Sequence, residues 1–473
     1  NLQFDEFSSN SIFRAQNSSM QEQTLWGHPK GLYILFFTEL WERFSFYGMR
    51  AILVLYLTAE TLGDNPGLGW DNASALELYG WYGMLVYMMS IPGGLLADRW
   101  LGQKKSVFLG GILIILGQFT LAIEGMTAFY SGLALIICGV GALKPNISTM
   151  VGGLYKAGDI KRDAGFTIFY IGINIGAFSA PLLVGYFGEI VDWQLGFSLA
   201  GFGMILGQIV YVFGRKHLTG IGDSHHASPE NTALMKKPLT KIEKDRMIVL
   251  FLSFLIMIVF WGAYEQAGGF MNLYAKQTVD RMVFGFEIPA SFLQSLHAFY
   301  VIIFGAPMAA FWLWWRKRGK ESSSIFKMAI GTIVMGFGFM ALMGAAWEVS
   351  ISALGKASLY WLLLSYFLHV IGELSSSPVA LSFITKLAPA KYASFMMGAY
   401  FAVTGLGNKV AGLIGEAAEN AGAMEVFTAV TIFCLAFGLL LLVFVKRLKA
   451  LTHGAEEMRP EAPHDEEAQS IAE

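Results

Sequence analysis

Four charged residues interrupt one of the most apolar segments of the chain, residues 35–50. A helix turns about 100° per residue, so Glu39, Arg43 and Arg50 fall within roughly 40° of one another, and Glu42 flanks them about 60° away. Each such charge costs at least about 2.5–3.5 kcal/mol at the centre of a bilayer unless it faces a partner or a water-filled cavity. This charged stripe therefore predicts an ion or substrate pathway.

The composition is that of a protein with many membrane spans. Hydrophobic residues make up 55% of the 473 residues and charged residues 14%, and the mean hydropathy is +0.52, which is too apolar for an ordinary soluble protein. A net charge of −2 without a basic tract gives no indication of nucleic-acid binding. Cys138 and Cys434 both lie in apolar runs, so we expect no disulfide framework, no metal site and no cofactor.

Apolar stretches of roughly 18–25 residues predict an all-α membrane protein with twelve transmembrane helices. They are centred on residues 31–59, 74–97, 105–125, 127–150, 164–187, 195–214, 247–275, 289–315, 325–347, 357–385, 392–416 and 424–446.

The one long polar connection, residues 215–246, divides these helices into two sets of six. We therefore predict an N-terminal tail, a six-helix bundle, a cytoplasmic linker, a second six-helix bundle and a disordered acidic tail, at residues 1–30, 31–214, 215–246, 247–448 and 449–473. Residues 1–19 do not begin with Met and lack an apolar signal-peptide core, and we interpret them as a remnant that precedes a native start at Met20.

Charge placement predicts the orientation of the bundle. Lys and Arg in short loops are retained on the cytoplasmic side. If both termini are inside, the inner connections hold most of the basic residues, and the outer connections hold only Lys276, Arg281 and Lys356. We expect a multi-pass protein of the plasma (inner) membrane with both termini in the cytoplasm.

Two sets of six helices joined by a linker suggest the major facilitator architecture, whose substrate sites lie near the midplane between the halves. Residues 94–105 read GLLADRWLGQKK, which resembles the G-x-x-x-D-R-x-x-G-[RK] loop of that superfamily. The resemblance implies that Asp98 and Arg99 make a gating contact between neighbouring helices. The alternative interpretation is an ordinary basic loop on the cytoplasmic side.

Further segments resemble a narrower family. Residues 39–48, ELWERFSFYG, are similar to the E-x-x-E-R-F-x-Y-Y-G signature of the proton-coupled oligopeptide transporter (POT) family, and residues 169–176, FYIGINIG, to its F-Y-x-x-I-N-x-G. Matches on the fourth, seventh and tenth helices read GALKPN, WGAYEQ and GELSSSP, at residues 141–146, 261–266 and 372–378. The resemblance covers helices 1 to 11 in order. It implies a non-enzymatic symporter of protons and di- or tripeptides that works by alternating access.

The chemistry of a short peptide agrees with these residue types. A peptide is a zwitterion, and a dry site needs a complement at both ends. Arg43 and Lys144 supply a positive pole, and Glu373 with the amide of Asn174 supplies the opposite one. These are also positions that the family uses, and the resemblance adds further substrate contacts at Tyr47, Tyr87, Trp261, His297 and Tyr400.

Structural interpretations of these residues stay open. Lys144 precedes Pro145 and would then bind the carbonyls that the proline frees. Asn174 would be a hydrogen-bonding contact between helices, and Glu373 an acceptor beside the Ser-Ser-Ser-Pro kink.

Proton coupling needs a carboxylate that is protonated in one state and ionised in another. Burial raises the pKa of a carboxylate and a neighbouring arginine lowers it, so a contact that breaks and forms can change its protonation. Glu39, Glu42 and Arg43 form such a cluster, and Arg50 with Glu265 resembles the family's pair between helices 1 and 7. A proton on Glu265 would loosen that pair and let the halves separate outside.

The chain departs from the family pattern at three positions. Phe46 stands where the signature has its first Tyr, His297 where we align an Asn, and Tyr400 where we align a Trp. His297 would add pH sensitivity near neutrality, or would be a neutral hydrogen-bonding substitute for Asn.

Two other functions remain as alternatives. One is a carrier of the same fold for nitrate or another small anion, against which the negative pole argues. The other is a channel or a transceptor that binds peptides without moving them. An intramembrane enzyme is less favoured, because no Ser/Asp or H-E-x-x-H constellation occurs.

Overall fold

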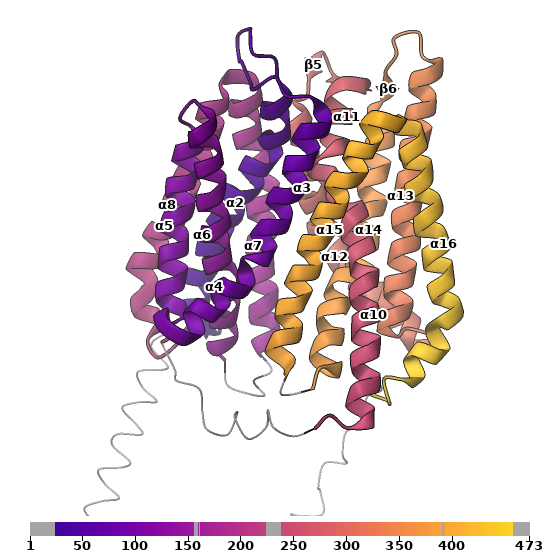
Figure 1. The fold of residues 1–473 in the computed structure, drawn as a ribbon. Coiled ribbons are helices and arrows are strands. Elements are labelled where there is room, and N and C mark those ends of the chain that lie inside the picture. The colour runs from indigo at the N-terminus through magenta and orange to yellow at the C-terminus, as the bar shows by residue number, and fades with distance from the viewer. Residues whose placement is uncertain (1–23, 156–158, 160, 224–237, 390–391, 457–473) are drawn as a thin grey trace, which may run out of the picture.

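The computed structural model describes residues 24–155, 159, 161–223, 238–389 and 392–456. Its long helices run roughly side by side in two groups, the N-terminal helices in indigo to magenta and the C-terminal helices in pink to yellow (Figure 1). The parts of the predicted tails and linker at residues 1–23, 224–237 and 457–473 lie outside the described residues, and the predicted domain boundaries stay predictions.

The first group, here called the N-half, has six membrane-crossing segments. Two of them are interrupted or extended by a π-helical turn, and one ends in a 3-10 turn. The segments are α2 (Lys30–Thr58), α3 (Asn72–Met88) with α4 (Ser90–Leu96) and η1 (Ala97–Leu101), α5 (Gln103–Leu121), α6 (Met126–Gly153), α7 (Lys161–Tyr186) with η2 (Phe187–Val191), and α8 (Trp193–Gly214) with η3 (Arg215–Leu218).

The second group, the C-half, also has six segments. Its first segment, the seventh of the chain, is a broken helix. The segments are α10 (Lys241–Tyr264) with η4 (Glu265–Gly268) and α11 (Phe270–Thr278), η5 (Ala290–Gln294) with α12 (Ser295–Lys317), α13 (Ser324–Ile351), α14 (Leu359–Leu387), α15 (Ala393–Ala421), and α16 (Ala423–Ala450). The twelve segments lie at the twelve apolar stretches that the sequence predicts.

The two ends of the bundle differ. The upper end in Figure 1, here called the distal end, holds the connection between α2 and α3 and two short strand pairs. These pairs are β3 (Val279–Asp280) with β6 (Ala357–Ser358), parallel, and β4 (Met282–Val283) with β5 (Phe286–Glu287), antiparallel. The opposite end, here called the linker end, holds η3 and the start of α10, and a short hairpin of β1 (Thr24–Leu25) and β2 (His28–Pro29) precedes α2.

Local side-chain chemistry fixes several helix boundaries. The Asp71 carboxylate accepts a hydrogen bond from Ser74 N at the start of α3, and Asp192 accepts one from Leu195 N at the start of α8. Thr240 and Glu243 form a reciprocal capping box at the start of α10. Each satisfies backbone N–H groups that have no partner within the helix. Gly422, at φ +100°, separates α15 from α16.

Nine of the described helical segments are long and apolar enough to cross a membrane by length and hydropathy alone. The remaining three among the described residues are α2, α3 and α15. Five charged residues lie in α2, α3 has only 17 residues before the chain bends at Met89, and α15 contains Asn408 and Lys409. These less apolar segments meet the opposite half, since α3 packs directly on α15. Polarity is therefore concentrated between the halves.

Small residues let the helices approach closely, as is common in membranes. A Cβ atom on Gly80 of α3 would lie 2.9 Å from Gly412 Cα of α15, so the two halves touch through backbone at this point. Within the N-half, a Cβ on Gly110 of α5 would lie 2.6 Å from Gly139 O of α6. Both distances are too short for a side chain without movement of a helix.

This packing leads to a test of the fold. We expect Gly110→Ala to destabilise the protein by about 1–3 kcal/mol, because the new methyl group collides with the α6 backbone. Gly94→Ala is the matched control, because a Cβ there meets no atom within 4 Å and alanine favours the helix. Thermal unfolding of the two variants in detergent checks this, and an equal midpoint for both would contradict the packing described here.

Candidate functional site: charges between the two halves

The charged stripe of the sequence is buried near the middle of α2. Glu39, Glu42 and Arg43 are all 2% exposed or less. The Arg43 guanidinium donates two hydrogen bonds to the Glu42 carboxylate, and its Nε lies 3.5 Å from Glu39 Oε1. Because paired and hydrogen-bonded charges are the kind that tolerate burial, the cluster partly neutralises itself within one helix. The cluster contains two carboxylates, Glu39 and Glu42, and one arginine, Arg43.

Aromatic rings cover the cations of α2. The Arg43 guanidinium carbon lies 4.9 Å from the centroid of the Phe46 ring and 5.8 Å from that of Tyr47. The Arg50 carbon lies 5.6 Å from the Tyr47 ring and 5.8 Å from Tyr79. Tyr47 thus contacts both arginines. Phe46 keeps the ring contact without a hydroxyl, so this role needs only the aromatic face.

A further cation reaches the site from α6. Lys144 Nζ lies 4.3 Å from the centroid of the Tyr87 ring, and Tyr87 belongs to α3. This contact places the Lys144 ammonium over an aromatic face, which stabilises the buried cation. The interpretation in which Lys144 binds carbonyls near Pro145 remains untested.

Arg50 and Glu265 join the two halves nearer the distal end. Arg50 of α2 lies 2.6 Å from Glu265 Oε2, and both side chains are at most 10% exposed. The Tyr79 hydroxyl accepts a hydrogen bond from Arg50 Nε at 2.9 Å and donates one to Glu265 O at 3.3 Å. Three elements, α2, α3 and η4, therefore meet in one buried network.

The break in the seventh span positions Glu265. α10 ends at Tyr264, and Glu265 begins the 3-10 turn η4. The end of a helix carries partial negative charge, so a carboxylate there needs a cation, and Arg50 supplies it. A Cβ on Gly268 would lie 2.3 Å from Tyr79 Oη and 2.6 Å from Arg50 Nε, so glycine makes the close approach possible. Interrupted helices of this kind line substrate sites in many transporters.

Glu373 lies in a separate cluster within the C-half. Its Oε2 accepts a hydrogen bond from the Tyr264 hydroxyl at 2.6 Å. The Tyr264 ring stacks on His297 with centroids 4.6 Å apart at an interplanar angle of 11°, and His297 meets Tyr366 edge to face. Tyr264 thus links Glu373 to His297, two residues that the sequence predicts to contact the substrate.

The remaining predicted contacts are buried or partly buried. Asn174 is 7% exposed, and its amide donates to Tyr170 O one turn earlier on α7 rather than to another helix. Trp261 lies edge to face with Tyr264, with centroids 5.2 Å apart. Tyr400 of α15 is 4% exposed. Their roles in binding stay predictions.

The halves meet at the distal end and leave space at the linker end. Asn272 and Gln294 of the C-half both donate amide hydrogen bonds to Ala51 O, at 3.0 and 3.3 Å. A cavity of about 720 Å³ at the linker end is lined mostly by the N-half and the residues that follow η3, among them Ser148, Thr149, Arg162 and Phe166, and also by Ile384 and Met397 of the C-half. The described conformation is therefore joined across the halves at the distal end, and at the linker end it has a cavity in the N-half that reaches the C-half at Ile384 and Met397.

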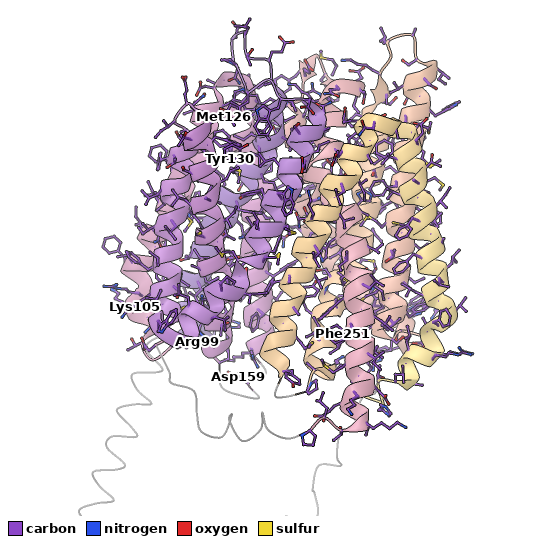
Figure 2. The ribbon with its side chains drawn as sticks, in the orientation of Figure 1. Arg99, Lys105, Met126, Tyr130, Asp159 and Phe251 are labelled. Carbon is purple, nitrogen blue, oxygen red and sulfur yellow. The ribbon has the colours of Figure 1, made fainter. Side chains whose placement is uncertain are left out.

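Asp98 and Arg99 lie in η1 at the linker end, and Figure 2 shows both Arg99 and Lys105 at this end. Asp98 and Arg99 are both exposed, and neither forms an ion pair with any residue that the structure describes. Lys104 nearby pairs with Asp223 at 3.1 Å. The predicted gating contact of Asp98 and Arg99 stays a prediction. Among the described residues no group of three His, Cys, Asp or Glu side chains is placed to hold a metal ion.

Sequence reasoning missed two tyrosines of this site. Tyr79 bridges Arg50 and Glu265, and Tyr264 bridges Glu373 and His297. Tyr264 stands inside the quoted segment WGAYEQ, immediately before Glu265. A tyrosine beside a buried carboxylate was a usable signal, because a buried hydroxyl needs a hydrogen-bond partner. Tyr79 gave no such local signal.

Comparison with known proteins decides the family. Residues 104–235 and 225–430 match the model of the POT family. The chain belongs to the POT family. The resemblance seen in the sequence is thereby confirmed.

The relatives cover almost the whole chain. It is 37% identical to a di-/tripeptide transporter of Lactococcus lactis, with 92% of this chain and 99% of the relative covered. It is 34% identical to the peptide transporter YePEPT of Yersinia enterocolitica, with 92% and 98% covered. A crystal structure of a mutant peptide transporter POT in complex with alafosfalin is 36% identical, with a TM-score of 0.83 over 92% of this chain and 98% of that one. The predicted major facilitator fold, with two bundles of six helices, is confirmed.

The buried pair between the halves gives a test that needs no substrate. We expect Glu265→Ala to destabilise the POT protein by about 3–5 kcal/mol, because it leaves Arg50 buried without its counter-charge. The double variant with Arg50→Met should lose less than the two single variants summed. Unfolding midpoints of the four proteins in detergent measure the coupling, and simple additivity would show that the pair contributes nothing specific.

Proposed function

We propose that the chain is a proton-coupled symporter that carries di- and tripeptides across the membrane by alternating access of its two halves. The observation that carries the proposal is the set of buried charges of both signs in each half of a POT family member, with the Arg50–Glu265 pair joining the halves. Lipid does not solvate such charges, so they are retained where a polar substrate and protons can reach them.

The positive pole would be Arg43 with Lys144. Arg43 offers a planar fork of donors that suits a carboxylate, and Lys144 offers a movable point charge. Arg43 is already bonded to Glu42, so a peptide carboxylate would compete with that side chain. This competition links substrate binding to the ionisation of Glu42.

The negative pole would be Glu373. The Tyr264 hydroxyl donates to one of its oxygens, so the carboxylate is held in place and still has acceptor capacity for a peptide ammonium group. His297 is stacked on Tyr264, and its neutral ring has one nitrogen that accepts a hydrogen bond. Asn174, Trp261, Tyr47, Tyr87 and Tyr400 would complete the pocket.

The described conformation corresponds to the inward-facing state of such a carrier, provided that the linker end faces the cytoplasm. The basic residues of the sequence favour this orientation, and Arg99 and Lys105 lie at the linker end (Figure 2). If both termini lie on the cytoplasmic side of the plasma membrane, the Arg50–Glu265 pair closes the extracellular side of the carrier. Protonation of Glu265 would remove its charge and release Arg50.

The same-fold alternative, a carrier of nitrate or another small anion, is not favoured. Glu373, Glu39 and Glu42 repel an anion, and an anion needs no negative pole. Relatives that are 34% and 37% identical are named as peptide transporters.

Transport in sealed vesicles tests the function. Proteoliposomes loaded with unlabelled dialanine should take up labelled dialanine by exchange without any gradient, and should accumulate it when the outside is more acidic. A channel, or a receptor that does not transport, would not concentrate labelled dialanine by exchange against the unlabelled dialanine inside. Accumulation of nitrate in place of dipeptide would replace this proposal with the anion carrier.

The positive pole gives a direct prediction. Arg43→Ala or Lys144→Ala should reduce gradient-driven dipeptide uptake to the level of empty liposomes, because either leaves the peptide carboxylate without half of its counter-charge. Lys105→Ala is the control, since Lys105 is an exposed lysine at the linker end. Wild-type uptake by both pocket variants, at equal amounts of inserted protein, would remove these residues from the binding site.

The carboxylates give a second prediction. Glu39→Gln, Glu42→Gln and Glu265→Gln mimic a permanently protonated acid, so proton-driven accumulation should fail while some exchange of peptide for peptide survives. Glu60→Gln, at an exposed distal position, should behave as the wild type. Both modes are measured in the same vesicles. Persistent accumulation in all three pocket variants would place the proton route elsewhere.

A further inference from the structure

A second carboxylate joins the halves at the distal end, away from Arg50 and Glu265. Glu189 belongs to η2 of the N-half, and its side chain is only 1% exposed. Its Oε1 accepts from Lys276 Nζ at 2.6 Å and from Ala290 N at 3.3 Å, and its Oε2 accepts from Ser291 N at 3.1 Å and Ser291 Oγ at 3.0 Å. All four donors belong to the C-half.

The N-half holds Glu189 firmly. The Asn65 side-chain amide donates to Gly188 O at 2.8 Å and to Glu189 O at 3.2 Å, and Asn65 Oδ1 accepts from Trp193 N. The loop between α2 and α3 therefore fixes the backbone of η2. This π-helical turn is the kind of local irregularity that often marks a functional position in a helix.

The C-half presents the start of a long helical segment to this carboxylate. η5 continues directly into α12, so Ala290 N and Ser291 N are first-turn amides without partners in their own helix. A carboxylate satisfies them and also complements the positive end of the helix dipole. A Cβ on Gly185, one turn before Glu189, would lie 2.4 Å from Ser291 Oγ, so the two segments are in close contact.

The same segment carries His297. This histidine follows Ser291 by less than two turns and stacks on Tyr264, the partner of Glu373. A displacement of η5 is therefore transmitted along a continuous helix to the pocket. The Arg50–Glu265 pair uses α2 and η4 instead, so the two inter-half contacts are structurally separate.

We propose that Glu189 is a positioning residue, which locks the distal end closed and sets the position of α12, and with it His297, in the peptide pocket. It caps a helix of the opposite half, so distal opening must break four bonds at once and free the start of α12. The inference rests on the proposed alternating access and adds a second closure to the one at Arg50 and Glu265.

Distances between spin labels test the proposal without substrate or gradient. In a background with Cys138→Ala and Cys434→Ala, labels at Glu124→Cys and Lys356→Cys report the distal end, one on each half. Labels at Lys105→Cys and Lys244→Cys, both exposed, report the linker end. Double electron–electron resonance spectroscopy of the protein in lipid nanodiscs measures both distance distributions.

Three further substitutions are compared in each labelled background. Glu189→Gln removes the charge and one acceptor oxygen, and Lys276→Gln removes the ion pair but leaves the helix cap. Glu287→Gln is the matched control, because Glu287 pairs with Arg281 inside the C-half. We expect a longer distal distance and a shorter linker-end distance for Glu189→Gln, a smaller shift in the same sense for Lys276→Gln, and the wild-type distributions for Glu287→Gln.

The opposite change at the two ends is what distinguishes a lock from a merely structural contact. Unchanged distal distances in Glu189→Gln, broadening at both ends, or an equal effect of Glu287→Gln would each overturn the proposal. If Glu189→Gln fails to fold, Lys276→Gln decides the question, because this lysine is 45% exposed and its loss leaves the cap intact. Dipeptide uptake is measured separately, so a failure of the proposed transport function would appear there and not in these distances.

Discussion

The structure depends on how ionised groups are kept out of lipid. Burying an unpaired charge in hydrocarbon is costly, so the charges of the central site are held against an opposite charge, an aromatic ring or, for Glu373, a tyrosine hydroxyl. Arg43 is paired with Glu42 in its own helix, Arg50 with Glu265 across the halves, and Lys144 lies over Tyr87. The Arg50–Glu265 contact requires an interface between bundles, and the two-bundle fold provides it. A substrate with both charges fits the same requirement.

The interface between the halves is therefore more polar than the outward faces of the bundle. The outward faces show apolar side chains such as Phe251 on α10 (Figure 2), while α2, α3 and α15 concentrate polarity between the halves. Close glycine contacts such as Gly80 with Gly412 keep the halves in register without strong polar adhesion. Weak apolar packing and a few strong polar bonds together suit an interface that has to open and close.

The sequence predicted those features that depend on neighbours along the chain. The twelve spans follow from local hydropathy, and the Glu39, Glu42 and Arg43 cluster follows from helical spacing, so both were accessible. Features that join distant segments were accessible only through family resemblance, as for Arg50 with Glu265. The bonds of Glu189 to Ser291 and of Tyr79 to Arg50 were missed, because a carboxylate near a loop and a tyrosine in an apolar helix give no periodic signal.

The composition of α2 has a consequence for biogenesis. It precedes the other described membrane segments along the chain, and it is among the three described segments that hydropathy alone does not qualify to cross a bilayer. Glu42 and Arg43 are adjacent in the sequence, so they can pair as soon as both have been synthesised. Glu265 is synthesised only after α2 through α8. Until then Arg50 has no carboxylate partner from the seventh span. The buried charge of Arg50 therefore gains this partner only after translation of the C-half has begun, so the final packing of α2 is a late step in folding.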